Sequence, residues 1–215
     1  MSPHLIDDHH KLLQAPPAPA DAAFRHLTAL PSVTDSDGDI YSVELVDDGG
    51  AMADVYVRSC TTGDMAANLL LTFDLGFPAD YPGRVPQVKS VFVDEDYRLQ
   101  KISLAVYKRL TEHYGVLASD TDQTLGGMLL WAMGLARDAT LLITVMSVTG
   151  NMATPRQLNG FTECYQGNHN DLLAAGAGIW DITPGHLQNA DFTRLGFRPA
   201  GRLAEELILS ARKPA

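Results

Sequence analysis

The basic residues of segment 97–103, with the sequence YRLQKIS, could hold an anion. Arg98 and Lys101 follow an apolar run and three acidic residues, and they precede a helical pattern. Residues 89–110 hold five Lys or Arg against three Asp or Glu, whereas the rest of the chain is net acidic on both sides. A helix N-terminus adds unpaired amide N–H groups and a positive dipole end. The segment therefore leaves room for a phosphate-like anion at this turn.

Strands and a helix must position this turn. Apolar residues at Leu99, Ile102, Val106 and Leu110 have helical spacing, and Gly115 stands where that helix would end. Turn signals and β-rich runs predict strands at 39–46, 52–60, 68–77 and 88–93 before the helix, and then a strand at 116–119, a helix at 125–136 and a strand at 139–149. The chain ends in RLAEELILSARK, which fits either a helix or an edge strand.

This order of elements, with the sequence VFVDEDYRLQKISLAVYKRLTEHYGVLAS, resembles the GNAT-type N-acetyltransferases over roughly residues 39–148. The cofactor motif of that family reads R-x-x-G-x-G/A, often YRGKGIG, before a helix. The segment DTDQTLGGMLLW also looks like one in divergent, phage-encoded members. The resemblance implies an α/β (α+β) fold, GNAT-like, in which helices flank a mixed, mostly antiparallel sheet. It also implies acetyl-CoA as the cofactor.

The resemblance places acetyl-CoA between one strand and the turn that follows it. Backbone groups of Val91 and Val93 would hold the pantetheine arm, and the turn would hold the pyrophosphate. The implied cofactor-binding residues are Val91, Val93, Arg98, Leu99, Gln100, Lys101, Ile102 and Ser103.

The motif is degenerate in this chain. Arg98 keeps its first position, but Leu99, Lys101 and Ser103 stand where YRGKGIG has glycine. A phosphate must approach the backbone closely, and a Cβ obstructs that approach. Lys101 has two interpretations: its ammonium replaces the amides, or its side chain fills the cofactor groove and the turn is a solvated helix start. We favour the second, which predicts no cofactor or a weakened acetyl-CoA site.

No catalytic acid is evident, so the catalytic residues are unknown. The run LLWAMGLARD lacks the tyrosine with which family members often protonate the departing thiolate, and a second match at 189–197 has Phe192 at that position. Two functions stay open. One is a GNAT-like protein that has lost catalysis and acts as a structural or interaction module, as a phage (virion-associated) protein; the other is an N-acetyltransferase that transfers acetyl from acetyl-CoA to an amine.

Three further clusters contain residue types that could bind a metal or catalyse a reaction, but each has a simpler structural interpretation. His4, His9 and His10 with Asp7 and Asp8 contain metal-ligand types, but a solvated helix accounts for them. Cys164, His169 and Asp171 could form a thiol nucleophile, but their spacing fits a loop. Asp35–Asp39 lacks the downstream glutamate of a calcium loop and fits a turn. Trp131 and Trp180 fit core or interface positions. No metal site is predicted.

Composition limits the partners and the compartment. A formal charge of −10 disfavours nucleic acid and anionic membranes as partners. No secretory signal or membrane span is evident, and two cysteines are too few for a disulfide framework, which predicts a cytoplasmic or, if the protein is phage-encoded, a virion location. The predicted division is an N-terminal arm at 1–31, a GNAT-like domain at 32–150 and an extension at 151–215. Protein partners, or further copies of the chain, are expected on the arm and the extension.

Overall fold

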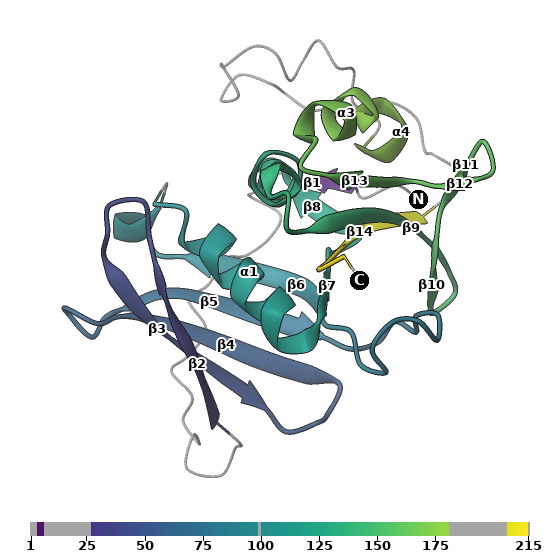
Figure 1. The fold of residues 1–215 in the computed structure, drawn as a ribbon. Helices are drawn as coiled ribbons and strands as arrows, with labels where there is room; N and C mark the ends of the chain where they lie inside the picture. Colours follow the sequence, from purple (N-terminus) through teal and green to yellow (C-terminus); the bar gives the residue numbers. More distant parts are fainter. Residues whose placement is uncertain (1–3, 7–26, 99, 181–205, 215) are drawn as a thin grey trace.

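A ten-stranded, mostly antiparallel sheet with short helices forms the fold of the computed structural model, which describes residues 4–6, 27–98, 100–180 and 206–214 (Figure 1). The predicted α+β class with a mostly antiparallel sheet is confirmed. The strands are β1 (His4–Ile6), β2 (Leu27–Thr34), β3 (Ile40–Asp47), β4 (Met52–Ser59), β5 (Met65–Thr72), β6 (Gln87–Val93), β7 (Val116–Ala118), β8 (Asp122–Thr124), β9 (Leu142–Thr149), β10 (Met152–Pro155), β11 (Gln157–Leu158), β12 (Phe161–Thr162), β13 (Cys164–Gln166) and β14 (Glu206–Arg212). The helices are η2 (Glu95–Tyr97), α1 (Ile102–Tyr114), α2 (Leu125–Leu129), η3 (Leu130–Gly134), η4 (Leu135–Arg137), α3 (His169–Ala174) and α4 (Gly176–Trp180).

The large sheet has the order β10-β9-β14-β7-β6-β5-β4-β3-β2, with β13 also paired to β9. Strands β2 to β6 form an antiparallel meander, of which the sequence predicts β3 to β6 but not β2. In β4 the side chains of Ala53, Val55 and Val57 alternate along the chain and are buried in the main core. This meander supplies the half of the sheet on which the cofactor turn would rest.

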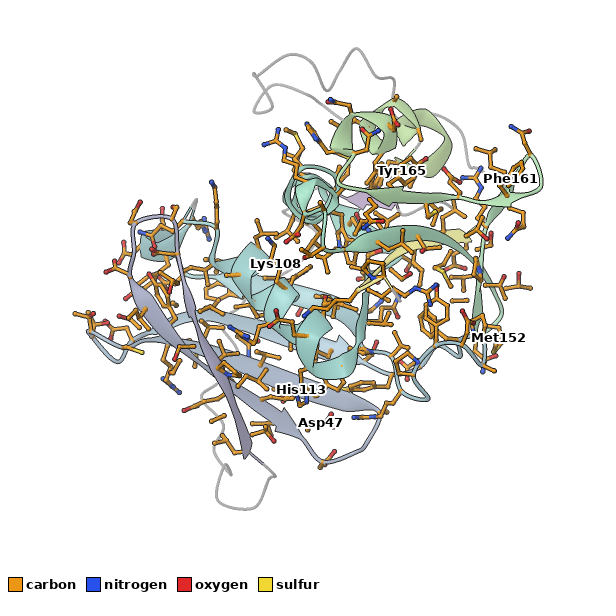
Figure 2. The ribbon with its side chains drawn as sticks, in the orientation of Figure 1. Asp47, Lys108, His113, Met152, Phe161 and Tyr165 are labelled. Carbon is orange, nitrogen blue, oxygen red and sulfur yellow. The ribbon has the colours of Figure 1, made fainter. Side chains whose placement is uncertain are left out.

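Helix α1 packs across the meander (Figure 1). Ile102, Val106 and Leu110, spaced four residues apart, are buried, as their periodicity predicts. The helix ends at Gly115, whose φ of 80° is the left-handed conformation that favours glycine at this position. An ion pair of 2.6 Å between Lys108 and Asp138 ties the helix to the other half of the molecule (Figure 2).

Strands β6 and β7 are parallel and pair only at Gln87 and Ala118. An irregularity at Lys89 separates the pairs that Val88 and Ser90 make with β5. Strand β7 pairs with β14 on its other edge over Val116–Ala118, and the Ser119 N–H continues that pairing by donating to the Leu209 carbonyl (2.7 Å), whereas no further pair forms between β7 and β6 in the described chain. The two parallel strands therefore diverge toward their C-terminal ends, with α1 connecting them.

The C-terminal strand β14 lies in the middle of the sheet, between β7 and β9. The predicted alternatives for this segment, a helix or an edge strand, are both wrong. Leu207 and Leu209 are buried in the main core, while Ile208 is buried in a second core on the other face. Burial on both faces explains the continuous apolar run, which has no alternation to mark it as a central strand.

The solvated helix predicted for the histidine cluster is wrong at His4, the residue of this cluster that the structure describes. His4–Ile6 form β1, which pairs in parallel with β8, and residues 27–34 form β2, an edge strand. Residues 7–26 lie outside the described residues. Pro31 falls at a register shift in β2, where a missing N–H costs no ladder bond. The strand thus crosses the predicted boundary at residue 31.

Residues 151–180, the described first part of the predicted C-terminal extension, form regular strands and helices. They form β10 to β13 and then α3 and α4, which lie over the β9 and β13 side of the sheet (Figure 1). Leu172, Ile179 and Trp180 from these helices join the main core, as does Trp131 from η3. The interpretation of the two tryptophans as core residues is confirmed.

Candidate functional site

The turn between β6 and α1 is the place where the sequence predicts an anion. Asp94 accepts a hydrogen bond from the Asp96 N–H (3.1 Å) and so caps the short η2 helix. Lys101 then takes a left-handed conformation with φ 62° before α1 begins at Ile102. No side chain caps the N-terminus of α1. A non-glycine residue in this conformation costs roughly 1 kcal/mol, so the turn stores strain at Lys101.

The structure places the predicted turn residues in different environments. Arg98 and Lys101 are exposed, Gln100 and Ser103 are partly buried, and Ile102 is buried in the core. Leu99 lies outside the described residues. The exposure of Lys101 agrees with the interpretation of the turn as a solvated helix start.

Val91 and Val93 present backbone groups to the gap between the diverging strands. The Asp94 N–H donates to the Ala66 carbonyl of β5, and alternation then directs the odd positions of β6 to the opposite edge. Strand β7 pairs with β6 only at Gln87, far from these two residues. The Val93 carbonyl, however, accepts a hydrogen bond from Arg98 Nε (3.2 Å). One of the two predicted pantetheine contacts is therefore engaged by the chain itself.

An acidic turn packs against the predicted anion site. The Ser36 N–H donates to the Gln100 carbonyl (3.0 Å), and the Tyr41 hydroxyl contacts both Asp35 (2.8 Å) and Gln100 Oε1 (3.3 Å). These contacts bring Asp37 and Asp39, both exposed, into the neighbourhood of Gln100. Carboxylates beside an uncapped helix start oppose the binding of a pyrophosphate.

Asp35 is ionised in this turn and organises it. Desolvation opposes its charge, but hydrogen bonds from the Tyr41 hydroxyl and from the N–H groups of Asp37 and Asp39 outweigh desolvation and lower the pKa of the carboxyl. The interpretation of Asp35–Asp39 as a structural turn is confirmed, because Asp35 accepts its hydrogen bonds from the chain itself. The described residues also hold no cluster of three or more His, Cys, Asp or Glu side chains suited to a metal.

A buried carboxylate stands where β6 and β7 separate. Lys89 Nζ of β6 contacts Asp120 Oδ1 beyond β7 at 2.9 Å, and the side chain of Asp120 is only 4% exposed. Beside it, Gln87 Nε2 donates to the Ser119 carbonyl (3.0 Å). These two bridges join the strands across the start of the gap. A group entering between them would have to displace an ion pair whose acidic member is desolvated.

Polar and aromatic side chains extend this cluster into the core. Gln123 Nε2 donates to the Asp120 carbonyl (3.3 Å), and Gln123 Oε1 accepts from Trp180 Nε1 (3.1 Å). Tyr107 of α1 is buried against Trp131, and burial, together with the nearby charge of Asp120, raises its pKa well above the ordinary value. Its hydroxyl therefore keeps its proton at neutral pH.

Sequence reasoning missed Lys89, Tyr107 and Asp120. Tyr107 lies three residues before Leu110, and the helical periodicity could have placed it on the buried face. Lys89 and Asp120 sit 31 residues apart, and only the parallel pairing of β6 with β7 brings them together.

The remaining sequence candidates do not assemble into sites among the described residues. Cys164 is exposed in β13, His169 begins α3, and Asp171 accepts a hydrogen bond from the Asn168 side chain. No hydrogen bond or ion pair joins these three residues. His9, His10, Asp7, Asp8 and Phe192 lie outside the described residues. Within the described ranges, no helix is long and apolar enough to cross a membrane.

Comparison with known proteins gives this chain no family. A scan against models of protein families and a search of curated proteins both returned no match.

Proposed function

We propose that this chain is a GNAT-like protein that has lost cofactor binding and acts as a structural or interaction module. The fold assignment draws on connectivity: a meander, a parallel pair that diverges around a connecting helix, and a last strand placed between β7 and β9. The proposed partners are proteins, including further copies of the chain or a virion assembly.

The acidic turn at Asp35–Asp39 is the observation that carries the loss of cofactor binding. Its Ser36 N–H holds the Gln100 carbonyl in the middle of the turn that would have to receive a pyrophosphate. With Asp94, Glu95 and Asp96 on the other side, six acidic residues flank Arg98 and Lys101. Two exposed cations against six carboxylates leave a net negative potential for an anionic ligand.

The gap itself supports the same proposal. The Lys89–Asp120 ion pair and the Gln87 bridge stand at the point of divergence, and Arg98 holds the Val93 carbonyl. An acyl chain would have to replace these contacts while leaving Asp120 buried without its cation, which is a strongly unfavourable exchange.

Calorimetric titration with acetyl-CoA tests the proposal. We expect no saturable heat with the wild-type protein. Replacing the exposed acids (Asp37→Asn with Asp39→Asn) and restoring the glycines (Leu99→Gly with Lys101→Gly) would raise the affinity, because charge and Cβ obstruction are the two barriers at the turn. Binding by the wild type at micromolar concentration would overturn the proposal.

An N-acetyltransferase acting on an amine is the second candidate. The left-handed Lys101 and the uncapped start of α1 favour it, because they leave amide N–H groups available to an anion. Transfer of a radiolabelled acetyl group to a panel of amines, with Asp120→Asn as a comparison, would establish this activity. The absence of transfer, together with a flat titration, would exclude it.

A further inference from the structure

The hairpin of β11 and β12 carries the most exposed large apolar side chain among the described residues. Phe161 is 77% exposed and Leu158 is 49% exposed. The two residues face each other across a turn at Asn159 and Gly160, whose φ angles of 52° and 83° form a two-residue hairpin loop. Phe161 lies at the outer end of this hairpin, away from the body of the protein (Figure 2).

The hairpin belongs to a longer projection, residues 152–166 (β10 to β13), which we call the hairpin arm. The base of the hairpin arm is firmly anchored. Strand β10 pairs with one half of β9 and β13 with the other half, so the arm leaves the sheet at Val145. There, the Arg156 N–H donates to the Val145 carbonyl (2.9 Å) and the Val145 N–H donates to the Glu163 carbonyl (3.0 Å). The Arg156–Glu163 ion pair of 3.3 Å reinforces the base. Phe161 is thus presented on a preorganised support, which lowers the entropic cost of binding.

Charge selects the partner of this arm. Residues 150–162, which form β10 to β12 and their turns, contain one charged side chain, Arg156, and Glu163 neutralises it, in a chain with a formal charge of −10. Met152, 42% exposed, lies at the start of β10 on the same side of the molecule (Figure 2). Two copies of so acidic a chain repel each other where the carboxylates of one copy face those of the other. A second copy can approach this uncharged stretch without that repulsion.

We propose that the hairpin arm (β10 to β13) mediates self-association through a two-fold contact. In this contact, Phe161 and Leu158 of one copy pack against Met152 and the arm of the second copy, and the reciprocal contact follows from the symmetry. Aromatic residues in such a position carry a large share of the binding energy. This inference rests on the proposed function, because it names the partner and the surface of the interaction module.

Sedimentation of the full chain over a range of concentrations tests the contact. We expect a reversible dimer in the wild type, and Phe161→Ser should weaken dimerisation by about 10-fold or more. Leu158→Asp should abolish it, because it places like charges opposite each other. Ile40→Ser is the matched control, since Ile40 is 51% exposed on β3, at the other side of the sheet, and should leave the dimer intact. Circular dichroism should be unchanged in all three variants, because each side chain is exposed.

A wild type that stays monomeric at high micromolar concentration would overturn the proposal, as would a dimer that Phe161→Ser leaves unchanged or that Ile40→Ser weakens equally. Acetyl-CoA binding would refute the proposed function without altering the oligomeric state. A monomeric wild type would refute the arm contact without restoring acetyl-CoA binding, so the two proposals fail separately.

Discussion

The two ends of helix α1 differ sharply in how the surrounding chain supports them. At the C-terminal end, Asp47 accepts hydrogen bonds from the Tyr114 hydroxyl (2.6 Å) and from the Arg84 guanidinium. Arg84 also donates to the Gly50 carbonyl (2.6 Å) and stacks on Phe73, with 3.4 Å between guanidinium carbon and ring centroid. Each polar group in this cluster has a partner, and Gly115 ends the helix without strain.

The N-terminal end has the opposite character. Lys101 holds a left-handed conformation that favours glycine, no side chain caps the helix, and Arg98 and Lys101 are exposed. The contacts that do form tie the turn to acidic residues rather than preparing it for an anion. The difference teaches that the polar interactions that stabilise helix α1 are concentrated at its C-terminal end, away from the turn where the sequence predicts an anion.

Among the substitutions at the two ends of α1, Asp47→Asn should lower the free energy of unfolding the most. It removes the charge that Arg84 and Tyr114 share and leaves those partly buried groups poorly paired, so the free energy of unfolding should fall by about 2 kcal/mol. Urea denaturation measures this loss. Asp48→Asn, in the same turn but exposed, is the matched control and should change stability by less than about 0.5 kcal/mol. Equal losses of stability in both variants would mean that the hydrogen bonds of Asp47 with Arg84 and Tyr114 do not account for the effect.

The pH dependence of this loss sharpens the comparison. Burial would raise the pKa of Asp47, but hydrogen bonds from Arg84 and Tyr114 outweigh it and lower the pKa. A carboxyl with a depressed folded pKa contributes stability above its unfolded pKa of about 4, and this contribution is lost as the pH falls through the folded value. The stability gap between wild type and Asp47→Asn should therefore be constant from pH 7 to 5 and close below about pH 4. A stability difference that persists to pH 2 would contradict the view that the ionised Asp47 carboxylate causes it.

Lys101→Gly should stabilise the protein, in contrast to substitutions at the other end. Glycine relieves the left-handed strain, partly offset by the greater entropy of the unfolded chain, so a gain of about 0.5–1 kcal/mol is expected. Lys101→Ala removes the same charge but keeps the Cβ, and thermal unfolding should show no comparable gain. A gain shared by both variants would assign the effect to charge.

Arg98→Ala should change the free energy of unfolding the least. The side chain is exposed and donates one hydrogen bond, to the Val93 carbonyl, so a change in stability within about 0.5 kcal/mol is expected. A loss of more than about 1 kcal/mol in urea denaturation would show that Arg98 is a structural residue of the turn.

Local features of this fold were predictable from sequence, whereas the surroundings of the turn were not. The β3–β4 hairpin and the end of α1 at Gly115 follow from signals within a few residues. The placement of β14 depends on pairing with strands far away in the sequence. A charge count over residues 89–110 gives a basic segment, but it omits Asp35, Asp37 and Asp39, which tertiary contacts at Ser36 and Tyr41 bring to Gln100.

The proposal that the turn has lost cofactor binding is tested most directly by amide signals in the nitrogen–proton correlation spectrum of the labelled protein during titration with acetyl-CoA. The signals of Val91, Ile102 and Ser103 report on the gap and on the start of α1. We predict that these signals stay unchanged as acetyl-CoA is added. Saturable shifts at these three amides would contradict the account and establish a working cofactor site.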